Sequence, residues 1–213
     1  MTAPDVGICH VITLLELGGA QENTLYTVSH LRPPFRASLV CGEGGILDDE
    51  ARAMAEVPTI FVRSLVRPIR PTRDLDALAR LTGIFRRMRP RIVHTHSSKA
   101  GILGRIAARL AGVPVIVHSI HGYGFNVRQP APVRAAIIAL EKAVAPLTTH
   151  FIAVSRANLD QGVELGIFPR RKATLIRSGI PIRTFEAAAG GRSVRGADGL
   201  RRELGIPEGR PLV

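Results

Sequence analysis

The sequence predicts an α/β protein with a Rossmann-like, doubly wound and mainly parallel sheet. Seven short segments rich in β-branched residues alternate with longer segments of helical periodicity. The short segments are continuous apolar runs, which is typical of strands buried on both faces of a parallel sheet. Strands that alternate with helices in this way favour a doubly wound arrangement. Hydrophobic residues make up 46% of the 213 residues, which is enough to bury a core and excludes a disordered basic tail.

The strands are expected where apolar residues run without interruption. They are Val6–Thr13, Ser38–Cys41, Ile60–Val62, Arg91–His94, Val113–His118, Phe151–Val154 and Ala173–Ile176.

Helices are expected where apolar residues recur every three or four positions. Their stripes comprise Leu75, Leu78, Leu81, Phe85 and Met88; Ile102, Ile106 and Leu110; and Val133, Ile137, Leu140 and Val144. Thr72 is the predicted N-cap of the first of these helices. In the second helix, Arg105 and Arg109 are expected on a face next to the apolar stripe.

The end of the chain differs in composition from the rest. Residues 186–199 contain few large apolar residues and predict a linker. Residues 200–213 predict a short helix that ends at Gly205, followed by the first residues of a strand. We therefore expect one domain over residues 1–185, and the start of a second, truncated domain at 200–213. On this interpretation the chain is an N-terminal part of a longer protein.

The net charge of +12 is unevenly distributed along the chain. Residues 1–62 carry a net −5, residues 63–110 a net +10 and residues 111–213 a net +7. A cluster of this kind suits either nucleic acid phosphate or an anionic lipid surface. The alternative is an ordinary solvated face in an arginine-rich chain, since 26 of the 29 basic residues are Arg.

The sequence carries no sign of export or of a membrane span. No apolar run reaches the roughly 18 residues that a span needs, and the N-terminus lacks a signal-peptide profile. Cys9 and Cys41 are too few for a disulfide framework. We expect a cytoplasmic protein, with peripheral association at the inner face of the membrane.

Ligands of doubly wound sheets bind at the carboxyl ends of the strands, so the loops there are the candidate sites. After the first strand, Gly18 and Gly19 lead into a helix. The missing Cβ atoms and the positive helix end suit a phosphate or diphosphate. The loop is neither a GxGxxG fingerprint nor a P-loop, and the alternative is a tight turn that needs positive φ.

The fourth strand leads into the segment His94-Thr-His96-Ser97-Ser-Lys99. The two histidines share one face, but no third ligand stands at a suitable spacing, so we expect no metal. The hydroxyls, the imidazole and the ammonium at a helix start suit hydroxyl-rich or anionic ligands. The alternative for Lys99 is a simple surface lysine.

The fifth strand leads into His121-Gly-Tyr123-Gly124. His121 lies further beyond the predicted strand end than His118, so it is the favoured polar site residue. It could donate a hydrogen bond to a sugar hydroxyl or to developing charge; the alternative is a histidine satisfied by local backbone. Nucleophile-based catalysis has little support, because the sequence has no GxSxG elbow and neither cysteine has an activating partner.

Six segments, taken in order, resemble the N-terminal domain of retaining, family-4-type glycosyltransferases with the GT-B fold. They are Gly18–Gln21, Leu65–Pro71, His94–Arg105, His121–Phe125, Ile152–Ser155 and Ile176–Ile180. The resemblance covers residues 6–185 and is closest to the bacterial branch that assembles exopolysaccharide, capsule or lipopolysaccharide.

This resemblance implies a transferase that moves a sugar from a nucleotide-sugar donor to a lipid-linked or polysaccharide acceptor. Gly18 and Gly19 would approach the donor diphosphate, and His121 would be the catalytic histidine beside the transferred sugar. The acceptor would contact the residues His96, Ser97, Lys99 and Tyr123. The resemblance implies no metal or other cofactor, and little or no activity for this chain alone.

Two other functions remain open at this stage. A sugar-nucleotide 2-epimerase of GT-B architecture would share the sheet and the glycine-rich loop. A non-enzymatic basic module that binds a membrane or nucleic acid would explain the charge. Nucleic acid is the less expected partner, because an aromatic content of 4% offers few platforms for base stacking.

Overall fold

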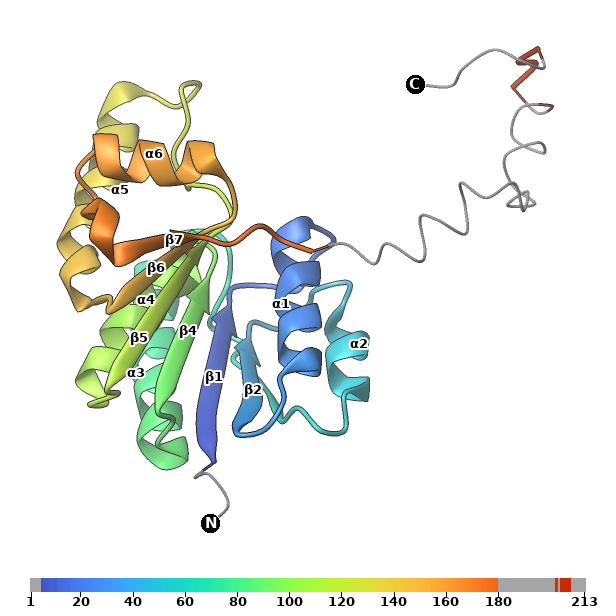
Figure 1. Cartoon of the computed structure of the whole chain (residues 1–213), viewed down its shortest axis with the longest axis vertical. Helices are drawn as coiled ribbons and strands as arrows, with labels where there is room; N and C mark the ends of the chain where they lie inside the picture. The colour runs from blue at the N-terminus through green and yellow to red at the C-terminus, as the bar shows by residue number, and fades with distance from the viewer. Residues whose placement is uncertain (1–4, 180–201, 203, 208–213) are drawn as a thin grey trace. The chain divides into compact units, whose positions relative to one another are not determined.

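The computed structural model describes residues 5–179, 202 and 204–207. All seven predicted strands form, and they make one parallel sheet in the order β3-β2-β1-β4-β5-β6-β7 (Figure 1). The strands are β1 (Val6–Ile12), β2 (Phe35–Cys41), β3 (Thr59–Phe61), β4 (Ile92–His96), β5 (Val115–Ile120), β6 (His150–Ala153) and β7 (Ala173–Leu175). The Rossmann-like prediction is confirmed.

Six α-helices connect the strands (Figure 1). They are α1 (Gly19–His30), α2 (Asp48–Ala53), α3 (Pro71–Met88), α4 (Ser98–Leu110), α5 (Ala131–Val144) and α6 (Arg156–Glu164), with short 3-10 turns at Ala145–Leu147 and Arg170–Lys172. Among the described residues, none of the helices has the length and hydropathy needed to cross a bilayer.

The two faces of the sheet bury different cores. Cys9 and Val11 of β1 pack with Leu81 and Phe85 of α3 in one core. The alternate residue Ile12 packs with Leu25 of α1 in a core on the other face. Consecutive residues of a strand point to opposite faces, so burial on both sides explains the continuous apolar runs of the sequence.

Helix α3 begins earlier than predicted. Pro71 is its first residue and Arg70 its N-cap, so the prediction of Thr72 as N-cap was wrong. Proline suits the first helical position because its φ is already helical. The Arg70 backbone N–H donates to the Asp74 carboxylate at 3.1 Å, which stabilises this start.

Helix α4 presents a different face to the core than the sequence suggested. Arg105 is fully buried, whereas Leu110 is exposed. Small residues bring this helix close to the sheet: a Cβ at Gly104 would lie 2.7 Å from Thr95 Cγ2. The small residues, and not the larger apolar ones, therefore mark the packed face.

The described residues divide into a compact unit within Met1–Ser178 and a second unit within Gly179–Val213. The predicted boundary at 185 and the linker 186–199 lie outside the described residues. Of the predicted second domain, only 202 and 204–207 are described. Gly205 there has a φ of 63°, a conformation that commonly ends helices.

Candidate functional site

A cavity of about 490 Å³ lies at the carboxyl edge of the sheet. Its position is the topological switch point, because β1 pairs with β2 on one side and β4 on the other. The lining residues come from four segments that follow strands or precede helices. They are Thr13, Leu14, Glu16, Ala20, Gln21, Arg67, Ser97, Ser98, Lys99, His121, Gly122, Tyr123 and Gly124.

Gly18 and Gly19 stand at the start of α1, whose Ala20 and Gln21 line the cavity. Gly18 has an extended backbone with a φ of 167°, and neither glycine lies in the left-handed region that such a turn needs, so the tight-turn alternative does not describe them. A Cβ at Gly18 would lie 2.9 Å from Gln21 Oε1, whereas Gly19 faces open space. The first turn of a helix has backbone N–H groups without intrahelical partners, which suits an anion here.

A second helix, α4, also begins at this cavity. Its N-cap Ser97 has a φ of 62° and a ψ of 159°, a conformation that is rare outside glycine. The Ser97 Oγ lies 2.8 Å from Thr13 Oγ1, and the Ala100 N–H donates to Thr13 Oγ1 at 3.1 Å. Thr13, from the loop after β1, thus caps α4 and holds the unusual turn in place.

Lys99 is not a simple surface lysine, because its side chain is only 14% exposed. Its ammonium forms an ion pair of 2.5 Å with Asp74 and donates to the Pro68 carbonyl. These contacts join the start of α4 to the first turn of α3 and to the segment before it. Part of the Lys99 charge is therefore neutralised within the protein.

Three histidines form a hydrogen-bonded chain that ends at the cavity. His10 Nδ1 lies 3.1 Å from His96 Nε2, and His96 Nδ1 lies 3.1 Å from His121 Nε2. His96 is buried, so it reaches the cavity only through His121. The prediction that His96 contacts an acceptor directly finds no support in this geometry.

Burial lowers the pKa values of these imidazoles. It lowers the pKa of His10 and of His121 to about 4. Burial is also the main cause that lowers the pKa of His96, with smaller contributions from the neighbouring histidines. At neutral pH all three rings are therefore uncharged.

His118 and His121 occupy different environments. His118 lies on the face covered by α4, with Nδ1 2.9 Å from Thr95 Oγ1. A Cβ at Gly101 would lie 2.5 Å from the His118 ring, so the helix packs directly on it. Of the two, only His121 lines the cavity.

The ring of Tyr123 lines the cavity, but its hydroxyl is already engaged. The hydroxyl donates to the Asn158 carbonyl at 2.9 Å, and the ring stacks on Phe125. Burial raises the pKa of Tyr123. A contact between Tyr123 and an acceptor thus stays a prediction, and the ring face is the part of the side chain available for it.

Strand β1 supplies a third histidine that the spacing in the sequence did not reveal. His10 pairs in register with His94, and ring nitrogens of His10, His94 and His96 lie within 4.8 Å of one another. Three imidazoles can bind zinc or copper. However, nitrogens of His10 and His96 already share a hydrogen bond, so a metal would have to displace it.

Residues 18–179 match the model of the glycosyl transferase 4-like domain. The chain belongs to this family. It is 36% identical, over 193 residues, to the UDP-Gal:alpha-D-GlcNAc-diphosphoundecaprenol alpha-1,3-galactosyltransferase of Escherichia coli. The match covers 88% of the chain and 48% of that enzyme, so the chain spans about half the length of its relative.

Solved structures share the fold of this glycosyl transferase 4-like domain. The Anabaena protein HepE, solved with UDP and glucose, matches with a TM-score of 0.72 at 17% identity, over 94% of the chain and 50% of HepE. The UDP-GlcNAc 2-epimerase of Neisseria meningitidis matches with a TM-score of 0.60 at 10% identity, over 96% of the chain and 54% of the epimerase. The Rossmann-like N-terminal half of a GT-B fold is confirmed, and it is common to transferases and epimerases.

Sequence reasoning missed several site residues of this glycosyl transferase 4-like domain. Thr13 and His10 contact residues of β4 and its following turn that lie more than 80 positions away in the sequence. Glu16 forms an ion pair of 2.6 Å with Arg67 among the lining residues. No local sequence pattern predicts such contacts, because their partners come together only when the chain folds.

Proposed function

We propose that the complete protein transfers a sugar from a nucleotide-sugar donor to a lipid-linked acceptor in cell-surface glycan assembly. One observation carries this proposal: the N-termini of α1 and α4 meet at a single cavity that His121 also lines. Two helix starts favour negative charge, and uncharged His121 can hydrogen-bond a sugar hydroxyl.

The donor diphosphate would lie at the start of α1. Gly18 and Gly19 leave room for it, since nothing lies within 4 Å of a Cβ at Gly19. His121 would stand beside the transferred sugar. The reaction would proceed with retention of configuration and without a metal cofactor.

The acceptor would occupy the side of the cavity formed by Ser97, Lys99 and Tyr123. The Escherichia coli relative is named for an acceptor with a diphosphate, which would suit the cations Lys99 and Arg67 at this cavity. Its 36% identity favours the transferase over the epimerase, which the fold alone does not separate.

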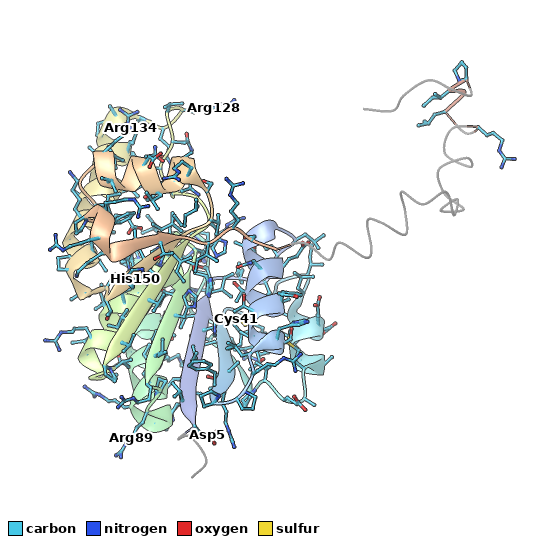
Figure 2. The ribbon with its side chains drawn as sticks, in the orientation of Figure 1. Asp5, Cys41, Arg89, Arg128, Arg134 and His150 are labelled. Carbon is cyan, nitrogen blue, oxygen red and sulfur yellow. The ribbon has the colours of Figure 1, made fainter. Side chains whose placement is uncertain are left out.

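Contact with an anionic membrane surface is part of the proposal, at the cytoplasmic face. The basic block 63–110 does not form one surface, however. Within the block, Arg89 lies at the end of the domain where the strands begin (Figure 2), whereas Arg67 lines the cavity at the carboxyl edge of the sheet. Of the cations in the block, Arg67 and Lys99 line the cavity, and the exposed side chain of Ile69 lies between Arg67 and Arg70 in the sequence.

Titration of the complete protein with UDP-galactose, followed by calorimetry, tests the donor site. Gly19→Glu places a carboxylate at the helix start, where it suits the helix but repels a diphosphate. We expect it to weaken binding at least tenfold while the chain stays folded. Ala135→Glu adds the same charge on an exposed position of α5 and is the matched control. Equal affinity in all three proteins would refute the proposed site.

The complete protein and this chain should also differ in turnover. We propose that the chain alone transfers little or no sugar, because it spans only about half the length of its relative. An assay with UDP-galactose and a lipid-diphosphate acceptor measures this. Robust turnover by the chain would contradict it.

A further inference from the structure

The histidine chain His10–His96–His121 has two unequal ends. At the inner end, His10 Nε2 is buried and makes no hydrogen bond with any described residue. At the outer end, His121 Nε2 is bonded to His96, and His121 lines the cavity. Its Nδ1 has no hydrogen bond among the described residues and is not among the buried unpaired atoms, so it is open to a ligand.

Neutral rings allow only two directions for the hydrogen bonds in this chain. In the first, His10 Nδ1–H donates to His96 Nε2, and His96 Nδ1–H donates to His121 Nε2. His121 then carries its proton on Nδ1. In the second direction every bond is reversed, and His10 must carry a proton on the buried Nε2.

The buried end of the chain decides between the two directions. In the second, the Nε2–H of His10 would be a buried donor without an acceptor, which folded proteins rarely contain. In the first direction His10 Nε2 holds only an unused lone pair, which is tolerated more readily. The first direction is therefore favoured.

We propose that His10 and His96 are positioning residues that fix His121 in its Nδ1–H tautomer. His121 then donates a hydrogen bond from Nδ1 to an oxygen of the ligand. It does not act as a general base, because Nδ1 holds the proton and Nε2 accepts from His96. The nature of that oxygen, in a sugar hydroxyl or a phosphate, rests on the proposed function.

The tautomers can be measured directly on the chain without any substrate. Long-range proton–nitrogen correlation spectra of histidine-labelled chain at pH 7.5 distinguish Nδ1–H from Nε2–H rings. We expect Nδ1–H tautomers for His10, His96 and His121, although the Nε2–H form predominates for neutral histidine in water. An Nε2–H tautomer at His121 in the unaltered chain would overturn the proposal.

Substitution of His10 tests the direction of control. His10→Leu removes the first donor, so we expect His121 to populate both tautomers. His10→Asn places an amide N–H near the position of Nδ1, and its reverse orientation would bury two unbonded N–H groups. It should therefore restore the Nδ1–H form of His121.

His150→Leu is the matched control, because His150 bonds only the exposed Thr174 and lies at the start of β6. An unchanged His121 tautomer in His10→Leu would overturn the proposal. The unaltered chain decides the matter even if His10→Leu does not fold. Zinc that binds one to one and shifts His10, His94 and His96 together would also overturn it, since a metal needs those lone pairs.

The ligand is tested separately by adding UDP-galactose to the labelled complete protein. A shift of the His121 Nδ1–H resonance supports the hydrogen bond to the ligand. If the tautomers are as expected but the His121 resonance does not shift, the proposed function of the cavity is contradicted. The control of the His121 tautomer by His10 and His96 would still be supported.

Discussion

The guanidinium of Arg105 and the carboxylate of Glu141 form an ion pair of 2.6 Å in which both side chains are buried. Arg105 also donates to the Gly101 carbonyl at 2.7 Å and to Thr148 Oγ1 at 3.4 Å. The pair thus joins α4, which forms one side of the cavity, to α5. A buried charge of this kind depends on its partner, because neither group can return to water in the folded state.

We expect loss of either partner to destabilise the fold strongly. Glu141→Gln or Arg105→Met should each lower the free energy of unfolding by about 3–5 kcal/mol, since an unpaired charge or polar group stays buried. Urea unfolding followed by circular dichroism measures this. Arg109→Met, on the exposed side of the same helix, should change stability by less than about 0.5 kcal/mol.

The double variant Arg105→Met with Glu141→Leu measures the coupling between the two residues. Because it removes both charges together, its loss should be far smaller than the sum of the single losses. A loss equal to that sum would show that the two residues act independently.

The buried histidines predict that stability falls as the pH drops below neutral. The pKa values of His10 and His121 are about 4 in the folded chain, below the usual 6.5. Above pH 6.5 both states are neutral and nothing changes. Between pH 6.5 and 4 these histidines bind protons in the unfolded chain but not in the folded chain. Each such histidine therefore lowers the free energy of unfolding by at most about 1.4 kcal/mol per pH unit.

Urea unfolding at pH 8, 7, 6 and 5 measures this dependence. His10→Asn lacks one of the titrating imidazoles, so its stability should fall less steeply between pH 6 and 5. The pKa of Asp76, lowered by the nearby Ser64 hydroxyl and by its ion pair with Arg80, affects stability only at lower pH. Constant stability from pH 8 to pH 5 would contradict the burial of neutral imidazoles.

The cap that Thr13 provides for α4 predicts a selective loss. Thr13→Val keeps the shape of the side chain but leaves the Ala100 N–H and Ser97 Oγ without this partner. We expect a destabilisation of about 1–2 kcal/mol. Thr13→Ser keeps the hydroxyl and should lose much less, so equal losses in the two variants would argue against the cap.

The sheet could be predicted from the sequence because burial on both faces leaves continuous apolar runs, and all seven strands confirm it. The face of helix α4 that packs against the sheet could not be predicted from the sequence. Arg105 is polar by type, and only its contact with Glu141, 36 positions away, makes it a core residue. The same limit applies to His10, whose role depends on the pairing of β1 with β4.

The position of Gly18 and Gly19 could be predicted from the sequence, but their backbone conformation could not. Gly18 and Gly19 were expected at a helix start, and they stand there. Sequence could not exclude a positive-φ turn at that position, because a glycine fits both. The backbone separates the two interpretations.

The segment before α3, together with the first residues of α3, predicts where the domain would touch a membrane. Ile69 and Leu75 are 82% and 68% exposed, and Arg67, Arg70 and Arg73 lie between or beside them in sequence. Lys99 holds this segment through the Pro68 carbonyl and Asp74. Exposed apolar side chains among cations suit a surface of anionic lipid, where each cation contributes about 1 kcal/mol.

Sedimentation with vesicles measures this contact. The chain should bind vesicles that contain anionic lipid more strongly than neutral ones, and binding should weaken as salt is added. Ile69→Ser with Leu75→Ser should reduce binding several-fold. Leu110→Ser removes a similarly exposed side chain at the far end of α4 and should not. If neither the salt nor the double variant changes the binding, this segment does not contact the membrane.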